Sequence, residues 1–365
     1  MRTFDAIVIG AGIIGSALAR ELSLAGLHIA IVDPAPATVT TAAGMGHIVA
    51  MDDSPAQLAI TLYSRSLWQQ HSTLFPPNVA YHTPGTLWVA VDDKELAEVQ
   101  ARHRIYTEAG ARAEILSPTQ LAALEPNLRP ALAGALLIPN DAICHPPSAA
   151  AFYLAEAQRL HAHLFRSPAI EAARGRVLLA DGTTLESAKI ILATGTATTL
   201  LPALPIRKRK GHLILTTPAP NFLHHQIVEL GYLKSAHQIE SDSIAFNVQP
   251  RPNGQIVIGA SRQYSNVDPT PDPHILAALR ARAQAYMPAL AALETAAIRV
   301  GFRAATPDKL PLIGPTLDPT LYLAAGFEGL GITSAPGAAH LLADILLNRS
   351  PAIDLTPYCP SRLLL

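Results

Sequence analysis

The chain has 365 residues, of which 49% are hydrophobic and 15% charged, and its formal net charge is -1. This length and apolar content predict a large buried core and two domains rather than one. The small net charge favours neither nucleic acid nor an anionic membrane as a partner, and two cysteines are too few for a disulfide framework or a thiolate metal site. We therefore expect a cytoplasmic protein without a metal site.

The apolar segments are too short to cross a membrane. A membrane-spanning helix needs roughly 18 or more uninterrupted apolar residues, and His28, Asp318 and Glu328 interrupt the candidate stretches. The sequence thus predicts no membrane span. Residues 207–210 form a dense basic run, which we interpret as a solvated loop.

The N-terminal elements form a strand, a helix and a second strand. Apolar residues over Phe4–Ile9 and His28–Val32 predict the two strands, and Ser16–Ala25 predicts the helix between them.

A glycine fingerprint connects the first strand to the helix. The residues Gly10, Gly12 and Gly15 give the pattern G-x-G-x-x-G, and Asp33 follows the second strand. Glycines in this context permit a tight turn and a close approach of a pyrophosphate to a helix N-terminus, and the acidic residue accepts ribose hydroxyls. The unit therefore predicts a site for an ADP moiety, and at this point NAD and FAD both remain open.

The middle of the chain alternates between helical and strand patterns. Ser54 and Pro55 predict the start of a helix that reaches His71. The following elements are expected over Thr86–Val91 (strand), Asp93–Ala109 (helix), Ser117–Pro130 (a segment bracketed by prolines), Ser148–His161 (helix), and Val177–Ala180 and Ile190–Thr194 (strands).

The C-terminal half begins with β-rich segments. Strands are predicted over His212–Thr217, Ser243–Gln249 and Gln255–Ala260, with Asn253-Gly254 as a hairpin turn, which suits an antiparallel sheet. The remaining predicted elements are a helix over Asp272–Ala291, a strand over Leu321–Ala324 and a final helix over Gly337–Leu347.

Several motifs resemble, in order and spacing, the D-amino-acid oxidase family of flavoproteins, and above all its glycine oxidases and related amino-acid dehydrogenases. The resemblance covers essentially the whole chain. The segments that carry it are the glycine fingerprint, Thr41-Ala42-Ala43-Gly44-Met45, Ile191–Gly195, Pro250-Arg251 to Ser261, Val300–Arg303, and Ala324-Ala325-Gly326 to Gly331-Ile332.

The resemblance implies an α/β fold. An FAD-binding Rossmann-like domain of the glutathione-reductase type would be interleaved with an antiparallel-sheet α+β substrate domain. The implied division assigns residues 1–85, 141–210 and 300–365 to the FAD-binding domain and residues 86–140 and 211–299 to the substrate-binding domain. It also implies FAD rather than NAD. No cysteine lies near the matching flavin segments, so we expect the FAD to be held non-covalently.

Each matching segment implies a part of the cofactor site. The residues implied to bind FAD are Gly10, Gly12, Ile13, Ile14, Gly15, Asp33, Pro34, Thr41, Ala42, Ala43, Gly44, Met45, Val177, Thr194, Gly195, Gly326, Glu328, Gly329, Leu330, Gly331, Ile332 and Thr333. Of these, Val177 and Thr194-Gly195 are expected near the adenine and the pyrophosphate. The loop that contains Gly326, Gly329, Gly331, Ile332 and Thr333 is expected around the pyrimidine edge of the flavin.

The resemblance also implies a substrate site. Arg303 matches the position that anchors the substrate carboxylate, a role that suits a permanently charged guanidinium with two parallel donors. Met45 and His47 are further candidates. Asn247 stands where glycine oxidases have a substrate-side tyrosine, and Glu328 is either a polar element near the ring or a surface carboxylate.

The implied reaction is oxidation of a small amino acid or secondary amine to an imine, by hydride transfer to flavin N5 and with hydrolysis where applicable. Glycine, D-amino acids and D-hydroxyproline are the expected substrate types. The alternatives are an oxidase of sarcosine-type N-substituted amino acids, or the FAD subunit of a multi-protein amine dehydrogenase. Oxygen or another acceptor would take the electrons, and a homo-oligomer is compatible with the sequence.

Overall fold

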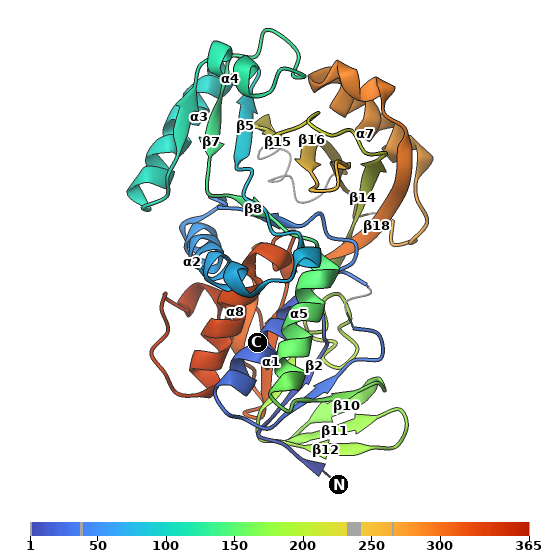
Figure 1. The fold of residues 1–365 in the computed structure, drawn as a ribbon. Coiled ribbons are helices and arrows are strands. Elements are labelled where there is room, and N and C mark those ends of the chain that lie inside the picture. The colour runs from blue at the N-terminus through green and yellow to red at the C-terminus, as the bar shows by residue number, and fades with distance from the viewer. Residues whose placement is uncertain (1, 37–38, 232–241, 265, 365) are drawn as a thin grey trace.

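The computed structural model describes residues 2–36, 39–231, 242–264 and 266–364, and these form two lobes. The lower lobe in Figure 1 holds the chain's N-terminus and most of its long helices, and the upper lobe holds a large sheet. Within the described residues, no helix is both long enough and apolar enough to cross a bilayer.

The lower lobe is built on a mostly parallel sheet, the lower sheet. In the described part of the chain its strand order is β19-β20-β13-β2-β3-β9, and every pair is parallel except β19–β20. The strands are β2 (Ala6–Ile9), β3 (Ile29–Val32), β9 (His163–Phe165), β13 (Ile190–Leu192), β19 (Leu312–Pro315) and β20 (Leu321–Ala325).

Strand β2 shows why this sheet lies in the interior. All four of its residues are apolar and buried, as expected for a parallel strand covered on both faces. Ala6 and Val8 pack with helices α1 (Ile13–Leu24), α5 (Pro146–Arg159) and α8 (Gly331–Leu346), whereas Ile7 and Ile9 pack with a smaller sheet. That smaller sheet comprises β1 (Arg2–Thr3), β12 (Thr184–Glu186), β11 (Arg176–Leu179) and β10 (Ala169–Ala173).

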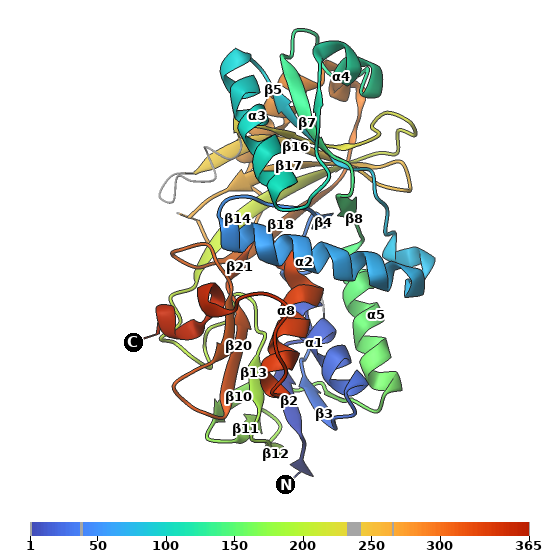
Figure 2. The same cartoon turned by 90° about the vertical axis from the view of Figure 1, so that its left-hand side faces the viewer.

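Helix α2 (Pro55–His71) lies across the boundary of the two lobes, above α1 and α8 (Figure 2). Its predicted start is confirmed, because the hydroxyl of Ser54 accepts a hydrogen bond from Gln57 N at 3.1 Å. Helix α8 starts six residues before the predicted Gly337 and contains Pro336.

Contacts from α2 explain why α8 continues through Pro336. A proline inside a helix lacks the N–H that would bond to the carbonyl four residues earlier. Trp68 Nε1 instead donates to Ile332 O and Thr333 O at 3.1 and 3.0 Å. Ser64 Oγ adds a bond to Thr333 O at 2.6 Å. Pro336 leaves Ile332 O without its helical donor, and Gly337 N, the helical donor to Thr333 O, donates to Ser64 Oγ at 2.9 Å. The bonds from Trp68 and Ser64 satisfy these two carbonyls.

The upper lobe is built on the upper sheet, whose order in the described residues is β21-β18-β14-β17-β16-β15-β5-β7-β6. Most neighbours are antiparallel, and β15–β5 is parallel. The strands are β5 (Thr86–Ala90), β6 (Glu114–Leu116), β7 (Gly134–Ile138), β14 (Arg207–Thr216), β15 (Gln226–Glu229), β16 (Ser243–Pro250), β17 (Ile256–Arg262), β18 (Thr295–Ala305) and β21 (Phe327–Glu328).

The two faces of the upper sheet differ in polarity. Phe246 and Val248 of β16 point toward α7 (Pro273–Tyr286), where Phe246 stacks on Tyr286 with ring centroids 4.4 Å apart. Because side chains alternate along a strand, Asn247 and Gln249 occupy the opposite face. Among the described residues, helices α3 (Asp93–Glu108) and α4 (Pro118–Leu124) also belong to the upper lobe.

The remaining elements are short. Two-residue strands β4 (His47–Ile48) and β8 (Ala142–Ile143) pair with each other. The 3-10 turns are η1 (Ser72–Leu74), η2 (Pro77–Val79), η3 (Pro288–Ala292), η4 (Thr356–Tyr358) and η5 (Pro360–Arg362).

The predicted fold class is confirmed. The interpretation of residues 207–210 as a loop is wrong, and their predicted exposure holds for Arg207 and Lys208 but not for Arg209 and Lys210. These residues begin β14, and Arg209 and Lys210 are each 1% exposed. Their charges are compatible with burial because Arg209 pairs with Glu328 and Lys210 Nζ donates to Thr270 O. The division into domains stays a prediction, and its boundaries at 210/211 and 299/300 fall within β14 and β18.

Candidate active site

The glycine turn between β2 and α1 is closed to side chains. Gly10 has a φ of +103°, and a Cβ there would lie 2.4 Å from Ala193 O. A Cβ on Gly15 would lie 1.8 Å from Gly10 O. Gly12 is the N-cap residue of α1, and it provides no side-chain cap. The first turn of α1 thus approaches the strand ends closely and presents backbone N–H groups, which is the arrangement that binds a pyrophosphate.

Asp33 lies at the end of β3, beside this turn. Its Oδ2 accepts a hydrogen bond from Ala11 N at 2.6 Å and its Oδ1 accepts one from Ala35 N at 2.8 Å. The carboxylate is therefore held in place by the glycine turn, where the sequence places a ribose-binding acid.

A cavity of about 520 Å³ extends from Asp33 to Arg303 and is lined by both lobes. Its size lies within the range of cofactor and ligand sites. The residues predicted for the site that line it are Gly10, Gly12, Ile13, Ile14, Asp33, Pro34, Thr41, Ala43, Gly44, Met45, His47, Thr194, Gly195, Asn247, Arg303, Gly326, Glu328, Gly329, Gly331 and Ile332. The glycine turn, the N-terminus of α1 at the cavity wall and the fixed carboxylate together fit a dinucleotide such as FAD.

Five predicted cofactor residues do not line this cavity. Val177 is fully buried in the core between the lower sheet and the smaller sheet, because its side chain alternates toward β2. The expected adenine contact of Val177 is therefore not at the cavity wall, whereas Pro168 and Ala169 do line it. The other four residues are Gly15, Ala42, Leu330 and Thr333.

Thr333 supports the site from behind the cavity wall. Its hydroxyl donates to His47 O at 2.9 Å and accepts from Val49 N at 3.3 Å. Because Thr333 lies in the first turn of α8, this helix fixes the segment that carries His47.

Arg303 lies on β18 where the cavity reaches the upper lobe. Its Nη1 donates to Ser261 O at 2.9 Å. The guanidinium lies against β14 at Gly211, where a Cβ would be 2.6 Å from Nη1. Gly211 thus provides the space that Arg303 occupies, although the sequence analysis did not single it out.

Replacing Gly211 by alanine tests this packing. The added methyl group is expected to displace the guanidinium and to lower kcat/KM for a carboxylate-bearing substrate by about tenfold or more, since misplacement of about 1 Å can cost about 100-fold. The flavin content should be unchanged. Steady-state kinetics measures the effect beside the control Gly231→Ala, whose Cβ would lie 3.5 Å from Glu95 Oε1, its nearest neighbour in the described part of the chain. Equal kinetics in the two variants would contradict the assigned packing.

Glu328 lies in β21 with a φ of +48° and lines the cavity. Its Oε1 accepts a hydrogen bond from Arg209 Nη1 at 2.8 Å. Burial alone would raise the pKa of this carboxyl, but the guanidinium groups of Arg262, Arg303 and Arg209 bring it to about 2. The side chain is only 12% exposed, so the interpretation of Glu328 as a surface carboxylate is wrong, and its place near the flavin ring stays a prediction.

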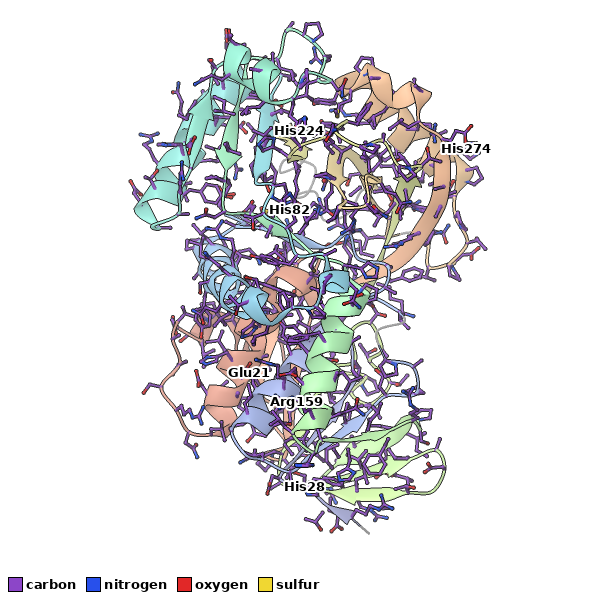
Figure 3. All side chains as sticks on the ribbon, viewed as in Figure 1. Glu21, His28, His82, Arg159, His224 and His274 are labelled. Atoms are coloured by element: carbon purple, nitrogen blue, oxygen red, sulfur yellow. The ribbon has the colours of Figure 1, made fainter. Side chains whose placement is uncertain are left out.

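His47 lies in β4 and also lines the cavity. Burial, together with the charges of Arg251 and Arg303, lowers the pKa of His47 to about 4 despite a hydrogen bond with Gln226 that acts in the opposite direction. His47 is therefore neutral at physiological pH. Other histidines are spread over the molecule, such as His28 in the lower lobe and His224 and His274 in the upper lobe (Figure 3).

Sequence reasoning missed the supporting polar residues of the site. Gln226 and Gln249 contact His47, and Arg251 donates to Cys144 O at 2.7 Å and to Met45 O. Arg251 belonged to a quoted motif, but its contacts are to segments more than 100 residues away. Within the described residues, no group of three or more His, Cys, Asp and Glu side chains is arranged to hold a metal ion.

Comparison with known proteins agrees with this geometry. The family model for FAD dependent oxidoreductases designated DAO matches residues 5–345. The chain is 29% identical to the glycine oxidase of Pseudomonas aeruginosa, covering 97% of this chain and 98% of that protein. It is 27% identical to the D-amino acid dehydrogenase of Vibrio cholerae, over 80% of this chain and 70% of that one.

A solved structure shows the same fold. The crystal structure of glycine oxidase from Geobacillus kaustophilus superposes with a TM-score of 0.88 at 22% identity, and 98% of each chain is covered. The expected resemblance is thereby confirmed, and FAD is the cofactor rather than NAD. This chain is an enzyme that belongs to the DAO family of FAD-dependent oxidoreductases.

Proposed function

We propose that this enzyme oxidises a small amino acid or secondary amine of the glycine, D-amino acid or D-hydroxyproline type to an imine, with FAD held non-covalently. The observation that carries the proposal is Arg303, a guanidinium held by Ser261 O at the upper-lobe end of the cavity. A guanidinium in a cavity is suited to bind a carboxylate through two parallel hydrogen bonds. The relatives named above, a glycine oxidase and a D-amino acid dehydrogenase, act on amino acids, which carry a carboxylate.

The protein's part in this reaction is positioning and electrostatics. When bound, FAD accepts the hydride equivalent that leaves the substrate carbon as the C–N bond becomes C=N. Arg303 would bind the carboxylate and so fix the direction of the C–H bond. Residues of the glycine turn, Asp33 and the loop from Gly326 to Ile332 would hold the cofactor, and the imine product would be hydrolysed by water where its chemistry permits.

The ionisation states of the site predict how the reaction depends on pH. His47, with a pKa of about 4, is neutral, and Glu328, with a pKa of about 2, is an ionised partner of Arg209. Neither group is suited to remove a proton from a bound ammonium, so the substrate must bind as the free amine. We therefore expect log(kcat/KM) to rise with pH, with a slope of about 1 below the pKa of the substrate amine.

The measurement is kcat/KM between pH 5.5 and 10 for two substrates whose amines differ in pKa. The pH range over which kcat/KM rises should shift with the pKa of the substrate amine. A fixed inflection near 6.5 for both substrates would mean that an enzyme histidine titrates, contrary to the assigned state of His47.

Reduction of the bound flavin without air tests the proposed substrate class. Glycine, sarcosine, D-alanine, D-proline and cis-4-hydroxy-D-proline are added in turn, and the visible absorption of the flavin is followed. Bleaching by at least one of them supports the proposal, and sarcosine alone would favour the N-substituted alternative. The proposal fails if saturating amounts of all five leave the flavin oxidised.

The second candidate is an FAD subunit of a multi-protein amine dehydrogenase, which the similarity to a dehydrogenase keeps open. Turnover of the purified chain is compared with oxygen and with an artificial dye. Turnover with oxygen supports an oxidase, turnover with the dye alone supports a dehydrogenase, and reduction only beside another protein supports the subunit.

A further inference from the structure

A cluster of uncharged polar side chains lies between the upper sheet and His47. Gln226 of β15 and Asn247 and Gln249 of β16 are 0%, 4% and 0% exposed. All three contact the imidazole of His47. Because buried polar groups need partners, the hydrogen bonds in such a cluster restrict the orientation of each member.

Gln226 fixes which nitrogen of His47 carries the hydrogen. Its Nε2 lies 3.1 Å from Ala142 O and 3.3 Å from Thr86 Oγ1. Since a backbone carbonyl only accepts, the NH2 of Gln226 must face Ala142, and its Oε1 then faces Nδ1 of His47. An amide oxygen also only accepts, so neutral His47 carries its hydrogen on Nδ1.

Gln249 agrees with this assignment. Its Nε2 donates to the same Oε1 of Gln226 at 3.0 Å. The 3.2 Å separation between that Nε2 and Nδ1 of His47 is then a contact between two donors that share one acceptor.

The tautomer of His47 in turn orients Asn247. With the hydrogen on Nδ1, the Nε2 atom of His47 is an acceptor, and it lies 3.2 Å from Asn247 Nδ2. The NH2 of Asn247 therefore faces His47, and its Oδ1 faces away. Among the described residues, none donates a hydrogen bond to this buried Oδ1. Asn247 also lines the cavity that Arg303 lines.

The charged groups around His47 maintain its neutral state. Arg251 lies near it through the bonds to Met45 O and Cys144 O, and Arg303 approaches it from β18. Both are cations and both oppose protonation of the imidazole. A protonated Nε2 would donate, and the amide of Asn247 would have to turn over.

We propose that Asn247 recognises the amino group of the substrate by accepting one of its N–H hydrogens on Oδ1, and that His47 and Gln226 are positioning residues that hold this amide in the accepting orientation. The assignment of Asn247 rests on the proposed amine oxidation. The assignment explains a buried acceptor, Asn247 Oδ1, to which none of the described residues donates, and which lies in the cavity wall shared with Arg303. An amide accepts from a free amine without taking its proton.

The orientation is tested on the resting holoenzyme by NMR. Long-range 15N–1H correlations of histidine-labelled protein, with His47 assigned by its loss in His47→Gln, should show hydrogen on Nδ1 from pH 6 to 8. Hydrogen on Nε2, or titration of His47 within that range, would overturn the positioning role.

The contact with substrate is tested by a double-mutant cycle. Asn247→Leu is expected to lower kcat/KM by about 3- to 10-fold, the usual worth of one hydrogen bond. Gln226→Leu should lower it through Asn247, so the double variant should resemble Asn247→Leu alone. The exposed Gln70→Leu in α2 serves as the control, and flavin content reports folding of each variant.

The outcomes separate this inference from the proposed function. Unchanged kcat/KM in Asn247→Leu, or effects of Asn247→Leu and Gln226→Leu that add independently, would overturn the assignment while the enzyme still oxidises amines. Asn247→Ser, which keeps a small acceptor, should fall between wild type and Asn247→Leu. A wild-type enzyme that no amine reduces would overturn the proposed function and this assignment together.

Discussion

Replacing Arg303 by alanine is expected to lower kcat/KM for the substrate by a factor of about 30 to about 4,000. Removing one partner of a buried charge pair costs on the order of 2 to 5 kcal/mol, which corresponds to that range. The cost arises because the carboxylate would enter the cavity without the guanidinium that Ser261 O and Gly211 hold in place. Steady-state kinetics with a substrate that bleaches the flavin measures it.

Two controls distinguish a lost contact from a lost fold. Arg303→Lys keeps the charge but has no planar pair of donors, so it should recover only part of the loss. Arg207→Ala removes an exposed arginine from the same sheet and should leave kcat/KM unchanged. All three variants should retain FAD. Wild-type kinetics in Arg303→Ala would remove Arg303 from the substrate site.

The second large effect is expected at the cofactor. Gly12→Val should yield colourless protein, because a Cβ at this N-cap position already lies 3.1 Å from Thr41 Oγ1 and two further methyl groups would enter the space for the pyrophosphate. Gly12→Ala should retain part of the flavin. The measurement is the ratio of visible to ultraviolet absorption in the purified protein.

Gly231→Ala is the matched glycine control, since it lies outside the cavity lining and, among the described residues, the atom nearest to its Cβ would be Glu95 Oε1 at 3.5 Å. It should bind FAD as the wild type does. Full flavin content in Gly12→Val would show that the pyrophosphate does not lie at this turn.

The N-terminal unit could be predicted because its signals are local. Apolar strands, a glycine pattern and an acidic residue follow one another within 33 residues, and the structure places Asp33 in contact with Ala11 N as that pattern requires. The hairpin at Asn253-Gly254 was predictable for the same reason, and Gly254 has the expected positive φ of +81°.

The features that escaped prediction depend on contacts between distant segments. Helix α8 continues through Pro336 because Trp68 and Ser64 bond to its open carbonyls, and no signal near Pro336 reveals this. Residues 207–210 were interpreted as a loop because four adjacent positive charges are usually solvated. The partner that permits the burial of Arg209, Glu328, lies more than 100 residues later.

The candidate site also combines residues that could be predicted from the sequence with residues that could not. Arg303, Met45 and His47 were predicted by resemblance and line one cavity in the structure. The amides that orient His47 belong to β15 and β16, and their register places Val228 beside Asn247. Because glutamine and asparagine side chains on strands carry no motif that names their partners, only the folded sheet shows that Gln226 and Asn247 meet the same imidazole.

The most direct test of the account compares an amino acid with the same amine lacking its carboxylate. D-proline and pyrrolidine, or glycine and methylamine, are mixed without air with the purified holoenzyme, and the visible absorption of FAD is followed. We predict that the acid of at least one pair bleaches the flavin and that its partner amine does so far more slowly. Equal bleaching by acid and amine, or oxidised flavin with both members of every pair, would contradict an enzyme that holds its substrate by Arg303.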